Sequence, residues 1–512
     1  MQTVNGTFVI TTLGCKVNQY DGAAVGQSLR QAGLVAAPRG AACDVAVVNT
    51  CCVTAPAMYK SRQAIRRAFR RADRAVLICG CYGDFDAPAC RELATELVPP
   101  GCRVFIAGHG DDLPQAIADI VEMLCGEAQR DAGVSPACLA GILPAPDCGT
   151  DSTPSADQPN GIHNAGETPA SRCASPAPHN LKSRRLAVVA RNAPADARLP
   201  AIEHFDDHQR AFVKIQDGCD AFCSYCVVPF TRSVVWSRPA EAVLAECRRL
   251  VKGGHREIVL SGVFLGAYGR STCCRRRWDD TPSPLGPLIE AVASIAGLWR
   301  VRLSSLEPGD LTAELLDVAK RCPNFAPHFH LPLQSGADTV LARMNRQYDS
   351  AGFLRVVERL RQAMDRPALT ADVIVGFPGE TDAEFERTLR VAGEAGFAAM
   401  HIFPFSAIPG TAAWAMRRRG PNEAVVQRRV RELTVLGESL SQKYRRQFLG
   451  QTLEGVVEIP SRDTVRRRAM TDRHVTIFFD PPPVGPEELT GQVRQFHILD
   501  DGDGGLVGRL TS

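Results

Sequence analysis

The stretch DGCDAFCSYCVVPFTRS, residues 217–233, places three cysteines, Cys219, Cys223 and Cys226, within eight residues. A structural zinc site would need a fourth ligand from elsewhere, and a disulfide would use two of the thiols and leave one over. The β-rich run AFVKIQ (211–216) comes directly before the stretch, so we expect the three thiols in a loop at the carboxyl end of a strand.

The composition is that of a large globular protein with an unusual number of cysteines. A chain of 512 residues is too long for one hydrophobic core and predicts two to four domains. The net charge of +3 neither requires nor excludes a nucleic-acid partner. No run approaches about 18 uninterrupted apolar residues and residues 1–16 do not resemble a leader, so we expect a cytoplasmic protein with no membrane partner. Nineteen cysteines in such a chain favour metal or cluster ligands over a disulfide framework.

Residues 206–445 alternate between β-rich runs and helical patterns, which predicts six βα units and therefore an incomplete parallel barrel, (βα)6. An amphipathic helix is expected from Pro421, an inserted loop over 273–284, and a small β-barrel over 446–512. The six runs are AFVKIQ (211–216), REIVLSG (256–262), WRVRLSS (299–305), PHFHLP (327–332), LTADVIVG (369–376) and AAMHIFPF (398–405).

Residues 1–127 also alternate between strand and helix, in the pattern of an open parallel sheet, so the fold class is α/β throughout. Three of the four β-rich runs end in cysteine, at Cys15, Cys51 and Cys81. Because the carboxyl ends of parallel strands meet at one edge, these thiols would converge, although three small buried residues would give the same pattern.

Residues 128–205 are rich in Pro, Ala, Ser and Gly and have no apolar periodicity, which predicts a disordered linker. Its three cysteines, Cys138, Cys148 and Cys173, are expected to have no role.

The spacing CxxxCxxC over 219–226 suits a 4Fe–4S cluster with three protein ligands and one open iron. This loop, with Tyr225 before its last cysteine, resembles that of radical S-adenosylmethionine (SAM) enzymes. The resemblance implies that Cys219, Cys223 and Cys226 are catalytic cluster ligands. It also implies SAM contacts at other strand ends: Tyr225; Ser304, Ser305 and Glu307 in LSSLEP (303–308); His330, Gln334 and Ser335 in HLPLQSG (330–336); and Gly376, Pro378 and Gly379 in VGFPGET (375–381).

The motifs LGCKVNQYD, VNTCCVT and CGCYG, together with those above, resemble the methylthiotransferase family over residues 1–125 and 206–512. The resemblance implies a second 4Fe–4S cluster on Cys15, Cys51 and Cys81, with Cys52 or Cys79 as possible substitutes. It further implies two SAM molecules per turnover, an electron donor such as a flavodoxin or ferredoxin, and a monomer.

The motif GCKVNQYD, with Lys16, Val17 and Asn18, resembles the branch that modifies N6-threonylcarbamoyladenosine next to the tRNA anticodon. This implies C2–H abstraction, sulfur insertion and methyl transfer to give 2-methylthio-N6-threonylcarbamoyladenosine. Three alternatives stay open: action on N6-isopentenyladenosine, action on a ribosomal-protein aspartate, and a non-catalytic iron–sulfur protein that binds RNA or senses redox state.

Three basic runs are candidates for contact with the anticodon loop of tRNA, although solvated faces give the same pattern. Residues 446–512 resemble the TRAM module, a small RNA-binding barrel, but they carry 8 Lys and Arg against 10 Asp and Glu. Ile408 stands where relatives usually carry an arginine. The basic runs are Arg66, Arg67, Arg70 and Arg71; Arg417 to Arg419; and Arg466 to Arg468.

Overall fold

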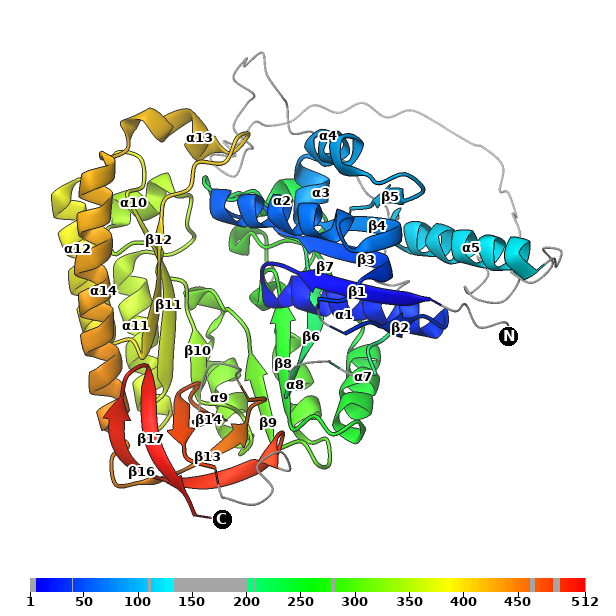
Figure 1. Ribbon diagram of the computed structural model, residues 1–512. Helices are drawn as coiled ribbons and strands as arrows, with labels where there is room; N and C mark the ends of the chain where they lie inside the picture. Colours follow the sequence, from blue (N-terminus) through cyan, green and yellow to red (C-terminus); the bar gives the residue numbers. More distant parts are fainter. Residues whose placement is uncertain are drawn as a thin grey trace, which may run out of the picture.

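The computed structural model describes residues 6–38, 40–108, 112–132, 200–203, 205, 209–278, 281–460, 466–481 and 489–511. Figure 1 shows an N-terminal sheet with its helices (blue to cyan) beside a central barrel-like part (green to orange), and a small C-terminal barrel (red) at one end of the central part. The architecture is α/β, as the alternation of strand and helix predicts.

The N-terminal part is a parallel sheet of order β2-β1-β3-β4-β5. Side chains of α1 and α5 pack on one face, and those of α2 and α4 pack on the other. The strands are β1 (Thr7–Thr12), β2 (Val35–Ala36), β3 (Cys43–Thr50), β4 (Ala72–Gly80) and β5 (Arg103–Ile106). The helices are α1 (Lys16–Gln31), α2 (Ala55–Phe69), α3 (Cys81–Phe85), α4 (Ala87–Leu97) and α5 (Asp112–Ala132).

The central part contains six parallel strands in two sheets, β6-β8-β9 and β10-β11-β12, with the short β7 antiparallel to β6. Bridges Val301↔Phe325 and Ser305↔His330 join the two sheets, whereas no pairing between β12 and β6 exists within the described residues. The predicted incomplete six-stranded barrel is confirmed. Its strands are β6 (Arg210–Asp217), β7 (Trp236–Ser237), β8 (Glu257–Gly262), β9 (Arg300–Leu303), β10 (His328–His330), β11 (Ala368–Val375) and β12 (Ala399–Pro404).

Helices cover the outside of these strands, and their apolar faces form one large core with the strands. The α-helices are α6 (Val228–Thr231), α7 (Ala240–Lys252), α8 (Leu285–Ala293), α9 (Ala313–Arg321), α10 (Asp338–Arg343), α11 (Ser350–Ala363), α12 (Asp382–Ala395) and α13 (Ala412–Met416). Short 3-10 turns are η2 (Leu265–Ala267), η3 (Arg275–Arg277), η4 (Pro308–Asp310) and η5 (Arg417–Arg419). The predicted inserted loop therefore contains one of these turns.

The long helix α14 (Glu423–Arg446) begins two residues after Pro421, because the side chain of Asn422 caps it by accepting from the backbone N–H of Val425 at 3.0 Å. The chain then forms a closed barrel of order β13-β14-β15-β17-β16, as predicted. Its strands are β13 (Thr452–Val457), β14 (Arg467–Thr471), β15 (Thr476–Phe479), β16 (Val493–Gly502) and β17 (Gly505–Leu510).

The turn between β14 and β15 packs against the amino ends of β9 and β10. The guanidinium of Arg302 donates to the carbonyls of Asp472 and Thr471, at 2.8 and 3.2 Å, and the His474 ring stacks on His328 with centroids 4.9 Å apart. The C-terminal barrel therefore closes the amino end of the central barrel.

The predicted linker over 128–205 differs from the structure at its start, because α5 continues to Ala132. Residues 133–199, with Cys138, Cys148 and Cys173, lie outside the described residues. Within the described part of the chain, no helix combines the length and apolar character needed to cross a membrane.

Candidate functional site

The cysteines that end the N-terminal strands lie together at one edge of the sheet. Cys15 precedes α1, Cys51 follows β3, and Cys81 is the first residue of α3 directly after β4. A Cβ on Gly14, which has a φ of +99°, would lie 2.9 Å from Sγ of Cys51, so the first two loops touch. Burial, and then the neighbouring Cys81 and Cys15 thiols, raise the pKa of Cys51 to about 12. The convergence expected from the strand ends is therefore present.

Asn18 joins these loops. Its Nδ2 donates to the carbonyls of Leu13 and Thr50, at 2.9 and 2.8 Å, and its Oδ1 lies 3.7 Å from Sγ of Cys81. Asn18 is fully buried. Asn18 belongs to the GCKVNQYD motif, whose resemblance to one branch of the family indicates the substrate. In the structure the same residue fixes the loops that carry the thiols.

The two possible substitute ligands lie on opposite faces of the sheet. Cys79 packs with Val47 and Leu77 in the core beneath α1 and α5. Cys52 lies in the core on the other face and donates from Sγ to the carbonyl of Cys81 at 3.3 Å. Cys52 interacts with both Cys51 and Cys81, whereas Cys79 interacts with Cys81 alone among the three predicted thiols.

The second group of thiols lies in the loop after β6. Gly218 opens this loop with a φ of +78°, and a Cβ there would overlap the carbonyl of Val234. The side chain of Asn345 donates to the carbonyls of Ala221 and Phe222, at 3.1 and 3.0 Å. The backbone N–H of Ser224 donates to the carbonyl of Met344, and its carbonyl accepts from the N–H of Ala413. The loop is therefore fixed from the barrel side.

The thiols of this loop face one another. Burial, and then the thiols of Cys223 and Cys219, raise the pKa of Cys226 well above its ordinary value. The guanidinium of Arg346 lies 3.2 Å from Sγ of Cys223 and pairs with the carboxylate of Glu307. The predicted SAM contact Glu307 thus reaches the cysteine loop through Arg346, a residue that sequence reasoning missed.

Two other predicted SAM contacts carry unused polar atoms. Oγ of Ser304 and Oε1 of Gln334 are buried without a hydrogen-bond partner in the described structure. Gln334 has a positive φ of 58°, which is uncommon for a residue other than glycine. Buried polar atoms without partners are rare in proteins, and these two fit a polar ligand at the strand ends.

The remaining predicted contacts lie in the VGFPGET turn, in the cysteine loop and after β9 and β10. Gly376 donates its N–H to the carboxylate of Glu380 at 2.7 Å, Pro378 is buried, and Gly379, with a φ of +78°, has open space where a Cβ would lie. Tyr225 packs beside the apolar cluster at Phe377. Ser305 is exposed, and Ser335 is fully buried with its hydroxyl 3.2 Å from that of Thr388.

A buried network of charges connects the two groups of cysteines. Arg232, 3% exposed, donates to Asp217 and Asp21 at 2.6 Å each and to Oδ1 of Asn18 at 2.9 Å. Its carbonyl accepts from the N–H of Cys219 at 3.0 Å. Lys214 completes the network by contacting both carboxylates, at 2.5 and 3.1 Å. Sequence reasoning missed this network, although charged residues within the apolar strand AFVKIQD were a signal for it.

Ile408, at the position where the resemblance places an arginine in relatives, is buried in this structure. Ile408 is 1% exposed and packs in an apolar cluster with Cys52, Cys81 and Val227. The position is therefore part of the packing between the N-terminal sheet and the cysteine loop.

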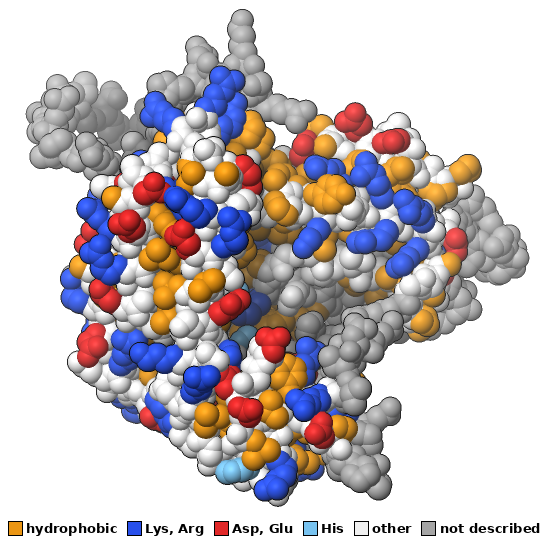
Figure 2. Space-filling view, turned by 60° about the vertical axis from the view of Figure 1, so that its left-hand side comes forward, with side chains coloured by type: hydrophobic (Ala, Val, Ile, Leu, Met, Phe, Trp, Pro, Cys, Tyr) orange, Lys and Arg blue, Asp and Glu red, His pale blue; other side chains and the backbone are white. Residues whose placement is uncertain are grey.

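The basic runs differ in exposure. Arg417 to Arg419 are exposed, whereas Arg467 is buried in the C-terminal barrel and donates to the hydroxyl of Thr490 at 2.7 Å. Figure 2 shows a hollow in one face of the molecule, with Lys and Arg side chains on both sides of it. This distribution suits a polyanion better than the overall charge suggests.

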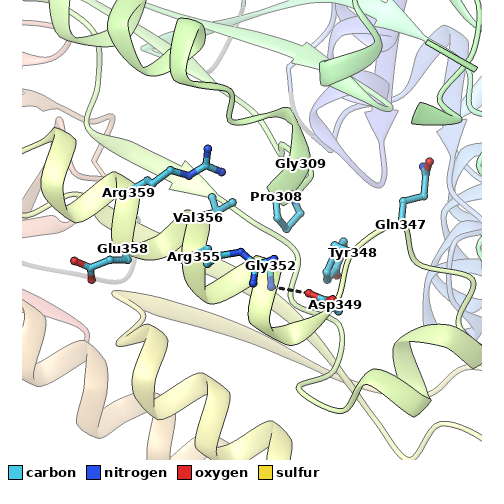
Figure 3. A pocket seen from close by; sticks show the side chains of 10 residues that line it. All are labelled: Pro308, Gly309, Gln347, Tyr348, Asp349, Gly352, Arg355, Val356, Glu358 and Arg359. Atoms are coloured by element: carbon cyan, nitrogen blue, oxygen red, sulfur yellow. Dashed lines mark hydrogen bonds between the residues drawn. The ribbon is translucent and has the colours of Figure 1, made fainter. Parts of the chain in front are cut away.

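One pocket of the described structure lies apart from the thiols. It has a volume of about 760 Å³ and lies between η4 and α11, where the N–H of Gly352 donates to Asp349 at 2.6 Å (Figure 3). No cysteine or histidine lines it, so it offers none of the chemistry of the strand ends. Its lining residues are Pro308, Gly309, Gln347, Tyr348, Asp349, Gly352, Arg355, Val356, Glu358 and Arg359.

Comparison with known proteins agrees with this geometry. Residues 213–392 match the Radical SAM superfamily, and residues 7–98 match the uncharacterized protein family UPF0004. The chain is 31% identical to the threonylcarbamoyladenosine tRNA methylthiotransferase of Bacillus subtilis, over 97% of this chain and 94% of the relative. This chain belongs to the radical SAM tRNA methylthiotransferase family.

Other relatives in the family differ in their names. The threonylcarbamoyladenosine tRNA methylthiotransferase of Chlamydia pneumoniae is 32% identical over 89% of this chain and 87% of the relative. The tRNA-2-methylthio-N(6)-dimethylallyladenosine synthase of Maricaulis maris is 37% identical over 59% of this chain and 65% of the relative. A solved radical S-adenosylmethionine methyltransferase, TsrM, from Kitasatospora setae covers 80% of this chain and 74% of its own at 12% identity, with a TM-score of 0.48.

Membership makes this chain an enzyme that uses two 4Fe–4S clusters and SAM. The residues present fit these groups. All six predicted ligands are free thiols in two groups at strand ends, and the unpartnered atoms of Ser304 and Gln334 suit the polar parts of SAM. A non-catalytic sensor, the remaining alternative, does not explain why the relatives of this chain are named as enzymes.

Proposed function

We propose that this methylthiotransferase converts N6-threonylcarbamoyladenosine next to the tRNA anticodon into 2-methylthio-N6-threonylcarbamoyladenosine. The observation that carries the proposal is the connection between the two groups of thiols, from Cys219 through Arg232 and Asn18 to Cys81. A fold that brings two cluster sites to one region allows hydrogen abstraction and sulfur insertion to take place at the same base. The names of the relatives from Bacillus subtilis and Chlamydia pneumoniae favour the threonylcarbamoyl substrate.

In this proposal, Cys219, Cys223 and Cys226 hold the cluster that takes SAM, and Cys15, Cys51 and Cys81 hold the auxiliary cluster. Tyr225, Ser304, Glu307, Gln334, Gly376, Pro378 and Gly379 surround SAM. When bound, these groups supply the one-electron, sulfur and methyl chemistry that substitution of an adenine C2–H bond requires.

The chain's own residues hold and shield these groups. Burial raises the pKa of the Cys223 thiol, and the positive charge of Arg346 beside it opposes that effect, while Glu307 fixes the guanidinium. Burial alone would lower the pKa of Arg232, but Asp217 and Asp21 keep it charged beside the N-terminal thiols. The fixed loops keep both cluster sites in constant positions relative to the base.

The partners follow from the same proposal. The anticodon loop of tRNA is the substrate, a flavodoxin or ferredoxin supplies electrons, and the enzyme acts as a cytoplasmic monomer. We propose four segments: an N-terminal domain at 1–127, which α5 extends to Ala132, a linker at 128–205, a radical SAM domain at 206–445 and a TRAM-like domain at 446–512.

The test is mass spectrometry of nucleosides from total tRNA, comparing a strain that lacks this gene with one that carries it. We expect a gene-dependent 2-methylthio-N6-threonylcarbamoyladenosine peak. A gene-dependent 2-methylthio-N6-isopentenyladenosine peak would instead move the enzyme to the branch named by the Maricaulis maris relative. If neither nucleoside depends on the gene, the proposal is wrong and a ribosomal-protein aspartate becomes the target to test.

A further inference from the structure

The inner wall of the central barrel carries a continuous chain of polar side chains. Nδ1 of His330 lies 3.0 Å from Oγ1 of Thr370, Nε2 of His330 lies 3.2 Å from Oδ2 of Asp372, and Nδ1 of His401 lies 3.1 Å from Oδ1 of Asp372. These residues come from three neighbouring strands, β10, β11 and β12 (Figure 1). This row of hydrogen-bonded side chains therefore depends on the pairing of the three strands in the barrel and not on any local sequence motif.

The alternation along the strands places this chain inside the barrel. On β11, Leu369, Ala371 and Val373 belong to the apolar core under the helices, so Thr370 and Asp372 point the other way. On β12, Met400 and Ile402 pack against the same core, so His401 and Phe403 also face inward. The exposed fraction of the side chain rises along this row, from 11% at His330 to 31% at Asp372 and 63% at His401.

Asp372 fixes the orientation and favours the charge of His401. Although burial opposes it, the hydrogen bonds from His330 and His401 hold the pKa of Asp372 below its ordinary value. The same bond to Asp372 raises the pKa of His401 above its ordinary value, against the effects of burial and of the nearby charge of Lys16. With Nδ1 donating to Asp372, the Nε2–H of protonated His401 is left for a ligand.

The wall beside His401 suits a nucleobase. Phe403 is 41% exposed, an unusual state for a large apolar side chain, and its ring lies edge-on to that of His401 with centroids 6.4 Å apart. An exposed aromatic ring beside a hydrogen-bond donor is the arrangement that binds an unstacked RNA base and reads its edge.

The other charged groups of this wall are paired with one another. Arg302 pairs with Glu257 at 2.7 Å, and each carboxylate oxygen of Asp372 contacts one imidazole. The Nε2–H of His401 is therefore the donor that this wall leaves for an acceptor on a ligand.

We infer that His401, supported by Asp372 and His330, pairs with the carboxylate of the threonylcarbamoyl arm while Phe403 contacts the base. This inference rests on the proposed function and names His401 as a residue that sets specificity for the anionic arm. A neutral isopentenyl arm has no acceptor for the Nε2–H of His401 and would leave this donor unpaired, which disfavours its binding.

The test measures binding of anticodon stem-loop RNAs to the cluster-loaded enzyme by fluorescence anisotropy. One RNA carries N6-threonylcarbamoyladenosine, and a second carries its carboxamide, which has the same shape without the charge. We expect the wild-type enzyme to bind the carboxylate RNA about 10-fold more tightly than the carboxamide RNA, as for a desolvated charge pair. His401→Gln should reduce that ratio to about 1–2, and should raise KM for the carboxylate RNA more than it lowers kcat.

His497→Gln in the C-terminal barrel is the matched control, because any general loss of RNA binding there changes both affinities equally and leaves the ratio unchanged. Equal binding of the two RNAs by the wild-type enzyme, or an unchanged ratio in His401→Gln, would overturn the inference.

Two His and one Asp could also hold a metal, because their ligand atoms lie within 4.8 Å of one another. Stoichiometric binding of Co²⁺ to the cluster-loaded enzyme that is lost in His401→Gln would identify a metal site and overturn the inference. Nucleoside mass spectrometry separates the two failures. If the threonylcarbamoyl product forms but the ratio does not respond to His401→Gln, only the arm assignment is wrong.

Discussion

At the scale of single residues, position in the fold distinguishes cysteines that look alike in the sequence. Cys79 and Cys81 are two residues apart, yet Cys79 packs in the core on one face of the sheet and Cys81 faces Asn18 beside Cys51. Both are almost fully buried, so burial alone does not identify a ligand. What matters is whether the thiol faces other thiols at the strand ends.

We therefore predict different results from Cys51→Ala and Cys79→Ala. Cys51→Ala should lose about half of the iron and all methylthiolated product while still cleaving SAM, because only the auxiliary cluster loses a ligand. Cys79→Ala should keep its iron and its product and lose only packing energy. Iron analysis, EPR and assays of 5′-deoxyadenosine and of product measure the difference. Full product formation by Cys51→Ala would show that Cys51 is not a ligand.

A second prediction concerns the loop cysteines. Replacing Cys219, Cys223 and Cys226 together by alanine should abolish reductive cleavage of SAM, because no thiol remains to hold the cluster with the open iron. Anaerobic incubation with SAM and a reductant, followed by chromatography for 5′-deoxyadenosine, checks this. Persistent cleavage in the triple variant would contradict the assignment of these ligands.

At the scale of secondary-structure elements, capping fixes where the strand-end loops stop. Thr381 and Glu384 form a capping box at the start of α12, directly after the VGFPGET turn. Arg343 and Thr339 at α10 also bond to the Glu384 carboxylate, at 3.1 and 2.5 Å. This carboxylate therefore joins two helices that border the predicted SAM turn.

The capping box predicts a dependence of stability on pH. Burial opposes ionisation of Glu384, but hydrogen bonds from Arg343, Thr339 and the N–H of Thr381 lower its pKa to about 2. Because the folded pKa lies below the unfolded value, this stabilisation is complete above about pH 4.5 and is lost as the pH falls toward 2. Glu384→Gln should cost on the order of 2 kcal/mol at pH 7, and the cost should shrink below about pH 4.5. Urea unfolding at several pH values measures this, and a constant difference between the two proteins would contradict it.

At the scale of the whole molecule, buried charges join the N-terminal sheet to the central barrel. Asp21 on α1 contacts Lys214 on β6 and Arg232 after the cysteine loop, and all three side chains are at most 5% exposed. Tyr20 and Ala24, also on α1, belong to the main core of the central part. The two cluster sites are thus held in one position relative to each other by an interface that is both apolar and charged.

Removing one charge from this interface should weaken the contact between the N-terminal sheet and the central barrel. Asp21→Asn leaves Lys214 and Arg232 with one carboxylate between them, and breaking a buried network of this kind costs about 3–5 kcal/mol. We expect lower unfolding midpoints and less product per SAM cleaved, while both clusters still assemble. Asp365→Asn, at a carboxylate whose side chain is 68% exposed, is the control and should change neither quantity. An unchanged product ratio in Asp21→Asn would show that the interface does not control coupling.

The sequence by itself determined the fold class and the candidate thiols, because both depend on local order along the chain. Alternation of strands and helices predicts parallel sheets, and in parallel sheets cysteines that follow neighbouring strands must meet at one edge. The spacing of Cys219, Cys223 and Cys226 is likewise a local property of one loop.

Only the tertiary structure decided how these parts are connected. The links from Asn18 to Arg232 and from His330 through Asp372 to His401 join residues that lie between 29 and 214 positions apart. A single sequence does not state which distant side chains meet, because that depends on strand register and on how one domain docks against another. The charges of Asp21 and Lys214 could be read from the sequence, whereas their burial in one network follows from packing alone.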